Sequence, residues 1–420
     1  MRLFTICSSL HGEIQKNAAL EPLVQQVESE VKAAGGTFEF CGEDFSRYRG
    51  TRDDVIYVRT GGTEGRFKEL FWGAGASAKL SRHTVLLTSG RSNSLAASME
   101  ILSFLRRHGL SGEILHGEDV AGRGGRRYVR NIVRPLVGRP ELGLRLGVVG
   151  KPSDWLIASD VDYDAVRSVL GVELVDVPMD VLLESYRGHK EAPHPNIKPL
   201  DIPRYGRPIS AKTFQDAVRL YGSLREVVAA GGLDGVALRC FDLLTAIGNT
   251  GCLALSLLNA GGNVAACEGD IPAMLSMAVA RRVAGTSGFQ VNLSQVRGSL
   301  GELLFAHCTV PLDIVDDYCY DTHFESGIGV ALHGQLPTGP ATLFKIAPDL
   351  GSYVAEDVLL DSNCYEDGLC RTQVLVKGRS RTHFEALASY LMRRPLANHH
   401  ILIPGAHAAA IRSLLGKTSE

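Results

Sequence analysis

Short apolar strands alternate with amphipathic helices through the first two thirds of the chain, and this alternation constrains the fold more than any other feature. Residues 84–93 (TVLLTSGRSN) have the pattern of a strand and turn that lead into a helix ending at Gly109. A further strand follows at 113–119. Because strands joined by crossover helices pair in parallel, the sequence predicts an α/β fold.

The strand and helix pattern occurs in two series. A join rich in Pro, Gly and Arg at 135–140 precedes a new strand at 144–150, so we place a domain boundary near residue 143. Beyond residue 310 the sequence predicts only short strands separated by Gly, Pro, Asn and Asp, as in a small barrel. We therefore predict two Rossmann-like parallel α/β domains and a C-terminal, mostly antiparallel β-barrel, at 1–142, 143–285 and 286–420.

The charge and the cysteine content exclude several classes of partner. Lys and Arg total 44 against 46 Asp and Glu, so no basic field favours nucleic acid. No window approaches 18 uninterrupted apolar residues, and polar residues interrupt the N-terminus before a signal-peptide core. The nine cysteines include no CxxC pair and are typical of reduced thiols. We expect a cytoplasmic protein with no nucleic-acid or membrane partner.

Two carboxylates, Glu268 and Asp270, lie between an apolar strand and a helix in the sequence ACEGDIP. Asp270 is of the residue type that caps a helix, here the one expected to begin at Ile271. Capping needs only Asp270. Glu268 remains where a buried strand emerges, and an isolated ionised carboxylate there requires a cation or strong hydrogen-bond donors.

Asn292, His307 and His399 also fall at the edges of predicted strands, where the ligand sites of α/β sheets gather. Together with Glu268 they offer oxygen and imidazole ligands that suit Mn²⁺, Mg²⁺ or Co²⁺. Strand alternation puts His399 and His400 on opposite faces, so at most one of them points into a given site. Two surface histidines at a strand start would give the same pattern.

A longer stretch of sequence, residues 264–311, contains VAACEGDIPAMLSMAVARRVAG, FQVNLSQV and LLFAHCTVP. It resembles the metal-binding core of the L-fucose isomerase and L-arabinose isomerase superfamily. Blocks at 150–159, 239–252, 370–376 and 397–405 extend the resemblance in the same order, over nearly the whole chain at the level of domain order. The chain is similar to a shortened member, abbreviated in the N-terminal domain and in the barrel.

The resemblance implies roles for single residues. Glu268 matches a glutamate that both binds the metal and serves in acid/base chemistry, and His307 and His399 match metal-binding histidines. Asn292, 24 residues after Glu268, stands at the position of the second carboxylate ligand. The expected cofactor is Mn²⁺, with Mg²⁺ and Co²⁺ as alternatives.

Asn292 departs from the family pattern in a way that affects the chemistry. An amide binds a metal through its carbonyl oxygen but has no proton to exchange. A second acid/base group is therefore needed beside Glu268, and we assign this catalytic role to Asp270. The other candidates are His307, His400 and Asp242.

The sugar would be held by residues from several parts of the chain. The resemblance implies that the N-terminal domain covers the active site of a neighbouring subunit in a homotrimer or homohexamer. The Gly-rich turn at 88–93 exposes backbone N–H groups that suit sugar hydroxyls or phosphate. The Arg-rich segment 121–130 lacks GxGxxG, which excludes a dinucleotide site, and its charge suits either a solvated surface or an anionic sugar group. The expected substrate-binding residues are Asn398, His400, Arg239, Asp242, Arg91 and Asn93.

These residues together predict a metal-dependent aldose–ketose isomerase. It would act on a free pentose, hexose, 6-deoxy or 6-sulfo sugar through an enediolate, with Glu268 moving the proton. A lyase or transferase that uses the same metal-enediolate site is one alternative, favoured by Asn292 and by the shortened barrel. A non-catalytic sugar-binding homologue is the other.

Overall fold

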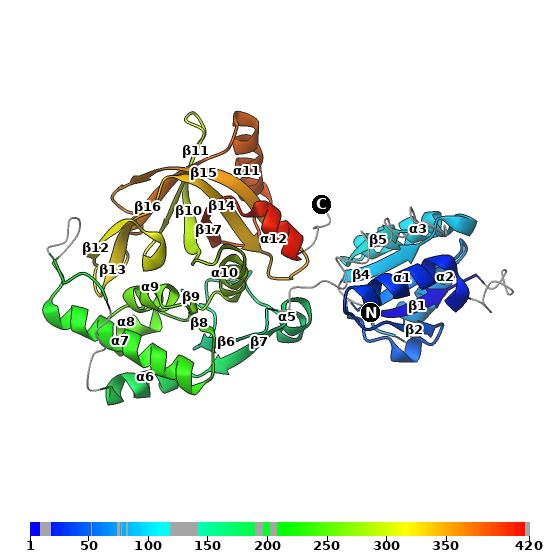
Figure 1. Ribbon diagram of the computed structural model, residues 1–420, viewed down its shortest axis with the longest axis horizontal. Coiled ribbons are helices and arrows are strands. Elements are labelled where there is room, and N and C mark those ends of the chain that lie inside the picture. Colours follow the sequence, from blue (N-terminus) through cyan, green and yellow to red (C-terminus); the bar gives the residue numbers. More distant parts are fainter. Residues whose placement is uncertain are drawn as a thin grey trace. The chain divides into compact units, whose positions relative to one another are not determined.

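The computed structural model contains two compact units, one within Met1–Arg139 and one within Pro140–Ser413 (Figure 1). The residues that the structure describes are 1–8, 18–51, 53–73, 76, 78–80, 83–117, 142–189, 196–201 and 208–415. The Arg-rich segment 121–130 lies outside them.

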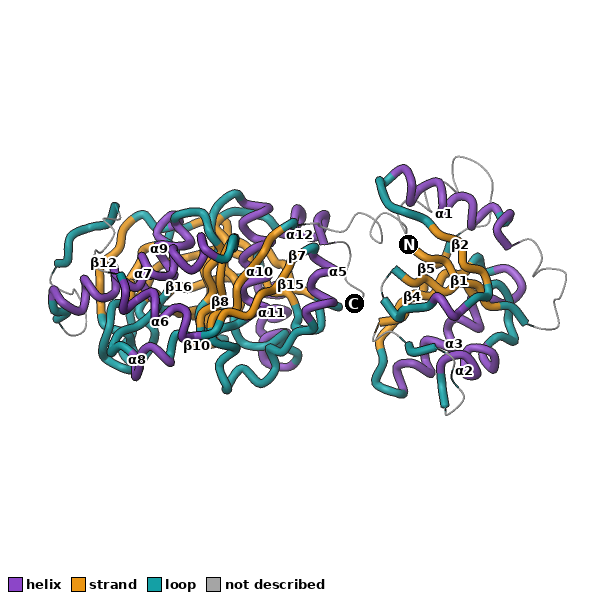
Figure 2. The backbone as a smooth tube through the Cα atoms, turned by 90° about the horizontal axis from the view of Figure 1, so that it is seen from below, coloured by secondary structure: helices purple, strands orange, loops and turns teal. Residues whose placement is uncertain are grey.

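The first unit is a five-stranded parallel sheet in the order β2-β1-β3-β4-β5. Alternate side chains of its strands face two separate hydrophobic clusters, as the pleat requires. Helix α1 covers one face, whereas α2 and α3 cover the other (Figure 2). The strands are β1 (Arg2–Ile6), β2 (Glu39–Gly42), β3 (Asp54–Val58), β4 (His83–Thr88) and β5 (Ser111–His116), and the helices are α1 (Pro22–Ala33), η3 (Phe45–Arg47), α2 (Glu64–Phe71), η4 (Arg91–Asn93) and α3 (Ser94–Arg107).

The second unit begins with a four-stranded parallel sheet in the order β7-β6-β8-β9. Strand β6 has its successor β7 on one side and β8 on the other, so the strand order reverses there, and ligand sites of such sheets lie beyond the carboxyl ends of the strands. The strands are β6 (Leu144–Val149), β7 (Val172–Val177), β8 (Gly235–Leu238) and β9 (Val264–Ala266). The helices are α5 (Tyr163–Leu170), α6 (Met179–Gly188), α7 (Ala211–Ala230), α8 (Asp242–Ala246), α9 (Cys252–Ala260) and α10 (Ile271–Ala284).

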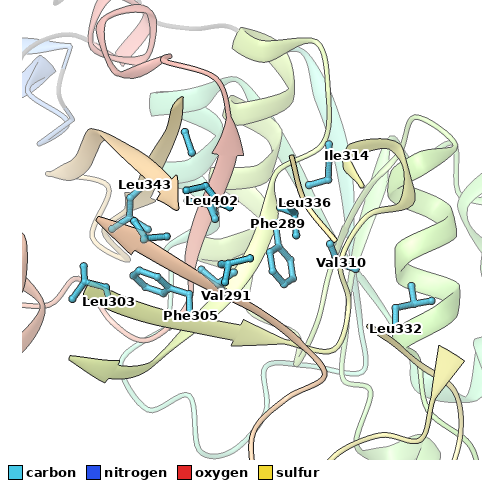
Figure 3. Packing of buried hydrophobic residues seen from close by; sticks show 14 of the residues in the cluster. Phe289, Val291, Leu303, Phe305, Val310, Ile314, Leu332, Leu336, Leu343 and Leu402 are labelled. Carbon is cyan, nitrogen blue, oxygen red and sulfur yellow. The ribbon is translucent and has the colours of Figure 1, made fainter. Parts of the chain in front are cut away.

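A closed antiparallel barrel in the order β10-β11-β16-β15-β14-β17 follows in the same unit. Alternate residues of its strands, such as Phe289, Val291 and Phe305, form a buried core (Figure 3). The same cluster includes Ala217 of α7 and Leu253 of α9, which joins the barrel to the helices of the sheet. The strands are β10 (Phe289–Arg297), β11 (Glu302–His307), β14 (Gly339–Ile346), β15 (Tyr353–Cys364), β16 (Thr372–Lys377) and β17 (His400–Pro404).

The region beyond residue 310 is not all strand, so that part of our prediction is wrong. The helix α11 (Arg381–Arg393) buries Phe384, Leu387 and Leu391 at helical spacing, and Ser380 caps it by accepting from His383 N. A separate two-stranded sheet pairs β12 with β13. The remaining elements are η5 (Leu312–Ile314), β12 (Asp317–Asp321), β13 (Ala331–Gln335) and α12 (Ala408–Leu415).

The predicted fold class is confirmed, with two parallel α/β sheets and a closed six-stranded antiparallel barrel. All nine cysteines lie among the described residues, and each is a free thiol. Within the described ranges, no helix combines the length and the apolarity needed to span a membrane.

Candidate metal centre

Three side chains from distant parts of the sequence meet beyond the carboxyl end of β9. Glu268 Oε1 lies 3.5 Å from His399 Nε2 and 3.9 Å from His307 Nε2. The three potential ligand atoms all lie within 4.8 Å of one another. The two imidazole rings meet edge to face, with centroids 5.3 Å apart. One carboxylate and two imidazoles in this arrangement form a group that can hold a divalent first-row metal ion.

The backbone at Glu268 adopts a conformation that few residues tolerate. Glu268 has φ 62°, in the left-handed region, and Gly269 follows with φ 67°. A Cβ at Gly269 would lie 2.4 Å from the carbonyl oxygen of Lys151, so only glycine fits there. The Glu268 carbonyl accepts from Ser153 N at 2.9 Å, which helps to hold the turn. A non-glycine residue in this region stores about 1–3 kcal/mol of strain, which concentrates at functional sites.

The two carboxylate oxygens of Glu268 face different partners. Oε1 faces the two histidines, and Oε2 accepts a hydrogen bond from Trp155 Nε1 at 2.7 Å. Burial alone would raise the pKa of Glu268, but His399, His307 and the Trp155 N–H outweigh it and lower the pKa to about 2. Glu268 is therefore ionised at neutral pH, the form in which a carboxylate binds a metal.

His399 is oriented by Asp270. The His399 Nδ1 donates to Asp270 Oδ2 at 2.8 Å, and both side chains are fully buried. Burial opposes the charged imidazole, yet Asp270 and Glu268 raise the pKa of His399 to about 9. Among the described residues, no group hydrogen-bonds the buried Nε2, which points toward Glu268. A carboxylate that holds one imidazole nitrogen while the other faces the ligand cluster is the usual arrangement around a protein-bound metal.

Asp270 has further contacts that fix its own position. Its Oδ1 accepts from Ala273 N at 2.7 Å, so Asp270 caps α10 as predicted. Lys345 Nζ lies 3.8 Å from the same oxygen and is also fully buried. Burial would raise the pKa of Asp270, but Lys345 and His399 lower it to about 2.

His307 is held in a neutral form that suits a metal ligand. Its Nδ1 lies 2.8 Å from Thr309 Oγ1, which leaves Nε2 directed toward Glu268. Burial, reinforced by the neighbouring charge of His399, lowers the pKa of His307 to about 3. The pKa values of the two histidines therefore shift in opposite directions, because Asp270 hydrogen-bonds His399 directly.

Asn292 lies within β10 and not at its edge, which differs from our expectation. The register pairs Val291 with His400, and one further step along the antiparallel pair brings Asn292 level with His399. The buried Oδ1 of Asn292 has no hydrogen-bond partner among the described residues. A buried carbonyl oxygen without a partner fits a neutral ligand beside the three-residue cluster.

Other predicted site residues are engaged elsewhere. His400 uses both nitrogens, with Nδ1 donating to the Asn398 carbonyl at 2.9 Å and Nε2 lying 2.8 Å from Tyr390 Oη. It thus faces away from His399, as strand alternation predicts. Arg239 forms ion pairs with Asp242 at 3.0 Å and Asp154 at 2.6 Å.

The remaining predicted substrate-binding side chains are exposed. Asn398 precedes His399 with its side chain open to solvent. Arg91 and Asn93 belong to η4 of the N-terminal unit and are also exposed. Asn93 has φ 59°, so the turn predicted from its Gly-rich sequence is present.

Sequence reasoning missed a row of three aromatic side chains that begins at Trp155, the hydrogen-bond partner of Glu268. The Trp155 ring meets Phe241 edge to face at 4.8 Å, and Phe241 in turn meets His323 at 5.6 Å. Trp155 lies in the block 150–159 and Phe241 in the block 239–252, both of which carry the family resemblance. His323 stands in an irregular connection between β12 and β13, and no pattern in the sequence marks it.

The two parallel sheets and the closed barrel agree with the predicted fold class, and Glu268, His307 and His399 form a group that could hold a metal ion. No protein-family model matches the chain. The chain is 26% identical over 213 residues to a sulfoquinovose isomerase of Alkalicoccus urumqiensis, covering 48% of this chain and 47% of that protein. It is 23% identical over 269 residues to a sulfoquinovose isomerase of Priestia megaterium, covering 61% and 59%.

A sulfoquinovose isomerase of a Clostridium species is 27% identical over 139 residues, covering 33% of this chain and 30% of that protein. The matches therefore span between 30% and 59% of the length of these curated relatives.

Proposed function

We propose that this protein is a metal-dependent aldose–ketose isomerase that acts on a 6-sulfo sugar of the sulfoquinovose type. The observation that carries the proposal is the convergence of Glu268, His307 and His399 at one point. The sequence similarity to proteins named sulfoquinovose isomerase supports the choice of substrate class.

The metal would be Mn²⁺, with Mg²⁺ or Co²⁺ as alternatives, held by Glu268, His307, His399 and the Oδ1 of Asn292. The buried His399 Nε2, which faces Glu268, and the buried Asn292 Oδ1, which lacks a hydrogen-bond partner among the described residues, support this ligand set. Bound there, the ion would act as a Lewis acid for the two sugar oxygens that carry charge in an enediolate.

Glu268 would move the proton between C1 and C2. Its two oxygens face different directions, with Oε1 toward the histidines and Oε2 toward Trp155. One oxygen can therefore hold the cation while the other takes and returns the proton. The Trp155 N–H keeps the carboxylate in one orientation.

Asp270, which we first assigned to proton transfer, is better suited to positioning. Both of its oxygens are engaged, one by His399 and the other by Ala273 N and Lys345. We propose that it fixes the tautomer and the orientation of His399, and through them the metal affinity.

The proposal includes a neighbouring subunit in a homotrimer or homohexamer, whose N-terminal domain would cover the centre with Arg91 and Asn93. Exposed apolar side chains in the connections that carry Trp155 and His323 support this cover. Trp155 is 51% exposed, Ile157 91% and Ile328 39%. Apolar residues exposed together in this way often mark an interface. The free thiols support a reducing, cytoplasmic setting.

The test incubates the purified protein with Mn²⁺ and a panel of pentoses, hexoses, 6-deoxy and 6-sulfo sugars, with EDTA as the control. We expect the 6-sulfo aldose to give one ketose of the same carbon number, and EDTA to stop the reaction. Asn292 in place of a carboxylate favours a second candidate, a lyase or transferase, for which two products would be found. Sugar binding without turnover would indicate a non-catalytic homologue and contradict the proposal.

A further inference from the structure

The connection between β12 and β13 brings a third imidazole, that of His323, toward the candidate centre. The His323 ring rests against Phe241, Phe241 against Trp155, and Trp155 donates to Glu268 at 2.7 Å. The charge of Glu268 raises the pKa of His323, and His323 lowers the pKa of His307. His323 is therefore linked to the Glu268 carboxylate through two aromatic rings and lies close enough for their charges to interact, although it is not one of the three clustered residues.

The segment that carries His323 is held firmly at its start. Arg371 Nε donates to the carbonyl of Thr322 at 2.7 Å and forms an ion pair with Asp321 at 3.3 Å. Thr322 N donates to Asp321 Oδ1 at 2.6 Å. These contacts fix the backbone on the N-terminal side of His323.

The end of the segment is equally fixed. A Cβ at Gly329 would lie 2.5 Å from Thr250 Oγ1, so the backbone there lies directly on Thr250. Val330 N also donates to Thr250 Oγ1, at 3.3 Å. The His323 side chain is thus presented by a segment anchored at both ends, as a preorganised group requires.

The hydrogen bonds of His323 define its tautomer. Ser326 N donates to His323 Nδ1 at 3.4 Å, and Ser326 Oγ lies 3.0 Å from the same nitrogen. Ile328 N donates to Ser326 Oγ at 3.4 Å, which leaves the Ser326 hydroxyl proton for Nδ1. The imidazole proton therefore resides on Nε2, for which the described residues provide no acceptor.

His323 is also kept neutral. Burial lowers its pKa and the Arg371 charge lowers it further, while Glu268 acts in the opposite direction. Glu325 is the other charged group of this segment near Glu268. A neutral imidazole with a free Nε2–H is a hydrogen-bond donor that does not lose its proton at neutral pH.

We propose that His323 is a further catalytic residue, whose Nε2–H donates a hydrogen bond to the sugar oxygen that becomes negative as the enediolate forms. This inference rests on the function proposed above. No proton is transferred to or from His323, because the bond only stabilises developing charge.

The other side chains considered for a second catalytic role already have hydrogen-bond or ion-pair partners. Asp270 holds His399, His400 contacts Tyr390, and Asp242 pairs with Arg239. The Trp155 N–H is used by Glu268, and Asn292 is proposed as a ligand through its Oδ1, so the His323 N–H is a donor that remains for the sugar oxygen. Preorganised donors of this kind stabilise a developing oxyanion without rearrangement of solvent.

The experiment compares His323→Ala, which removes the donor, with His323→Gln, whose side-chain amide can place an N–H near the position of Nε2. His333→Gln is the matched control, since His333 is a buried imidazole in the adjacent strand β13, beside Tyr365. The measurements are kcat and KM for the 6-sulfo aldose with Mn²⁺, together with Mn²⁺ affinity by calorimetry and thermal melting.

We expect His323→Ala to lower kcat about 10²-fold, the usual effect of losing one oxyanion donor, with KM and Mn²⁺ affinity nearly unchanged. His323→Gln should recover part of kcat, and His333→Gln should resemble the wild type. A His323→Ala protein with kcat close to the wild type would overturn this inference and leave the proposed function standing. So would a His323→Gln protein that folds and binds Mn²⁺ but recovers nothing. A wild-type protein that isomerises no sugar of the panel would overturn the proposed function itself.

Discussion

His399 donates its Nδ1 proton to Asp270 across 2.8 Å, although 129 positions separate the two residues in the sequence. The bond joins the start of α10 to the residue that precedes β17, so it connects the parallel sheet with the barrel. It also leaves His399 Nε2 facing Glu268. The shape of the candidate metal centre therefore depends on the contact between His399, which belongs to the cluster, and Asp270, which does not.

Asp270→Asn should weaken metal binding while the fold persists. The amide is nearly the same size as the carboxylate but carries no charge to hold the His399 imidazole. We expect Mn²⁺ affinity to fall about 10–100-fold, as for other partners of metal-binding histidines. Calorimetric titration of Mn²⁺ measures this effect. Asp162→Asn, which changes a capping carboxylate at α5, is the control and should bind Mn²⁺ like the wild type. Equal affinity in all three proteins would exclude the positioning role.

The stability of the metal-free protein should depend on Asp270 in acid. The pKa of Asp270 is about 2 in the folded protein, below the ordinary value of 3.8. A carboxyl whose pKa is lowered by folding stabilises the fold at every pH above its ordinary pKa. This stabilisation disappears as the pH falls from about 4 toward 2. Denaturant unfolding of wild-type and Asp270→Asn proteins across that range should give free energies of unfolding that converge as the pH falls. A constant difference would show that the Asp270 charge contributes nothing to stability.

Two glycines offer a matched test of the turn that presents Glu268. Gly269 and Gly285 have similar φ values, 67° and 73°, but only Gly269 has backbone within 3 Å of an added Cβ. Alanine at Gly285 should cost about 1 kcal/mol for the left-handed backbone. Alanine at Gly269 adds about 1–3 kcal/mol of overpacking against Lys151 and should also disturb Mn²⁺ binding. Denaturant unfolding measures both, and equal losses would contradict the close approach seen at Gly269.

His399 and His400 provide a comparison of neighbours on opposite faces. Mn²⁺ at about 100 times its dissociation constant should stabilise the wild type by about 2.7 kcal/mol, seen as a rise in Tm that EDTA reverses. His399→Gln should lose this rise because it removes a ligand atom of the cluster. His400→Gln should keep it, since His400 contacts Tyr390 instead. A rise lost in both variants would point to general disruption of the barrel edge and not to a metal ligand.

The fold could be predicted from local patterns because they are repeated along the chain. Alternating strands and helices predict the parallel sheets, and the Asp270 cap marks the start of α10. Helix α11 was not predicted, because its apolar residues Phe384, Leu387 and Leu391 lie in a region where strand-like runs dominate. These residues have helical spacing, but the strand-like segments on both sides of them favoured an all-strand interpretation.

The candidate site was predicted less completely, since it depends on contacts between distant segments. The choice of Glu268 followed from its position after a buried strand, but its unusual φ and the Trp155 hydrogen bond have no signal in a single sequence. The same holds for Asp270, whose capping role was visible while its bond to His399 was not. His323 reaches the site only through the packing of Phe241.

The most direct test of the proposed function follows a 6-sulfo aldose labelled with ¹³C at C1, incubated with Mn²⁺ and either the wild type or Glu268→Gln. The ¹³C shift of the labelled carbon then distinguishes the aldose, the ketose and a labelled fragment, and its time course gives the rate. We predict that the wild type gives a single ketose that carries the label at C1, and that Glu268→Gln, while folded, gives no measurable conversion. Two labelled or unlabelled fragments from the wild type, or wild-type turnover by Glu268→Gln, would contradict an isomerase that works through Glu268.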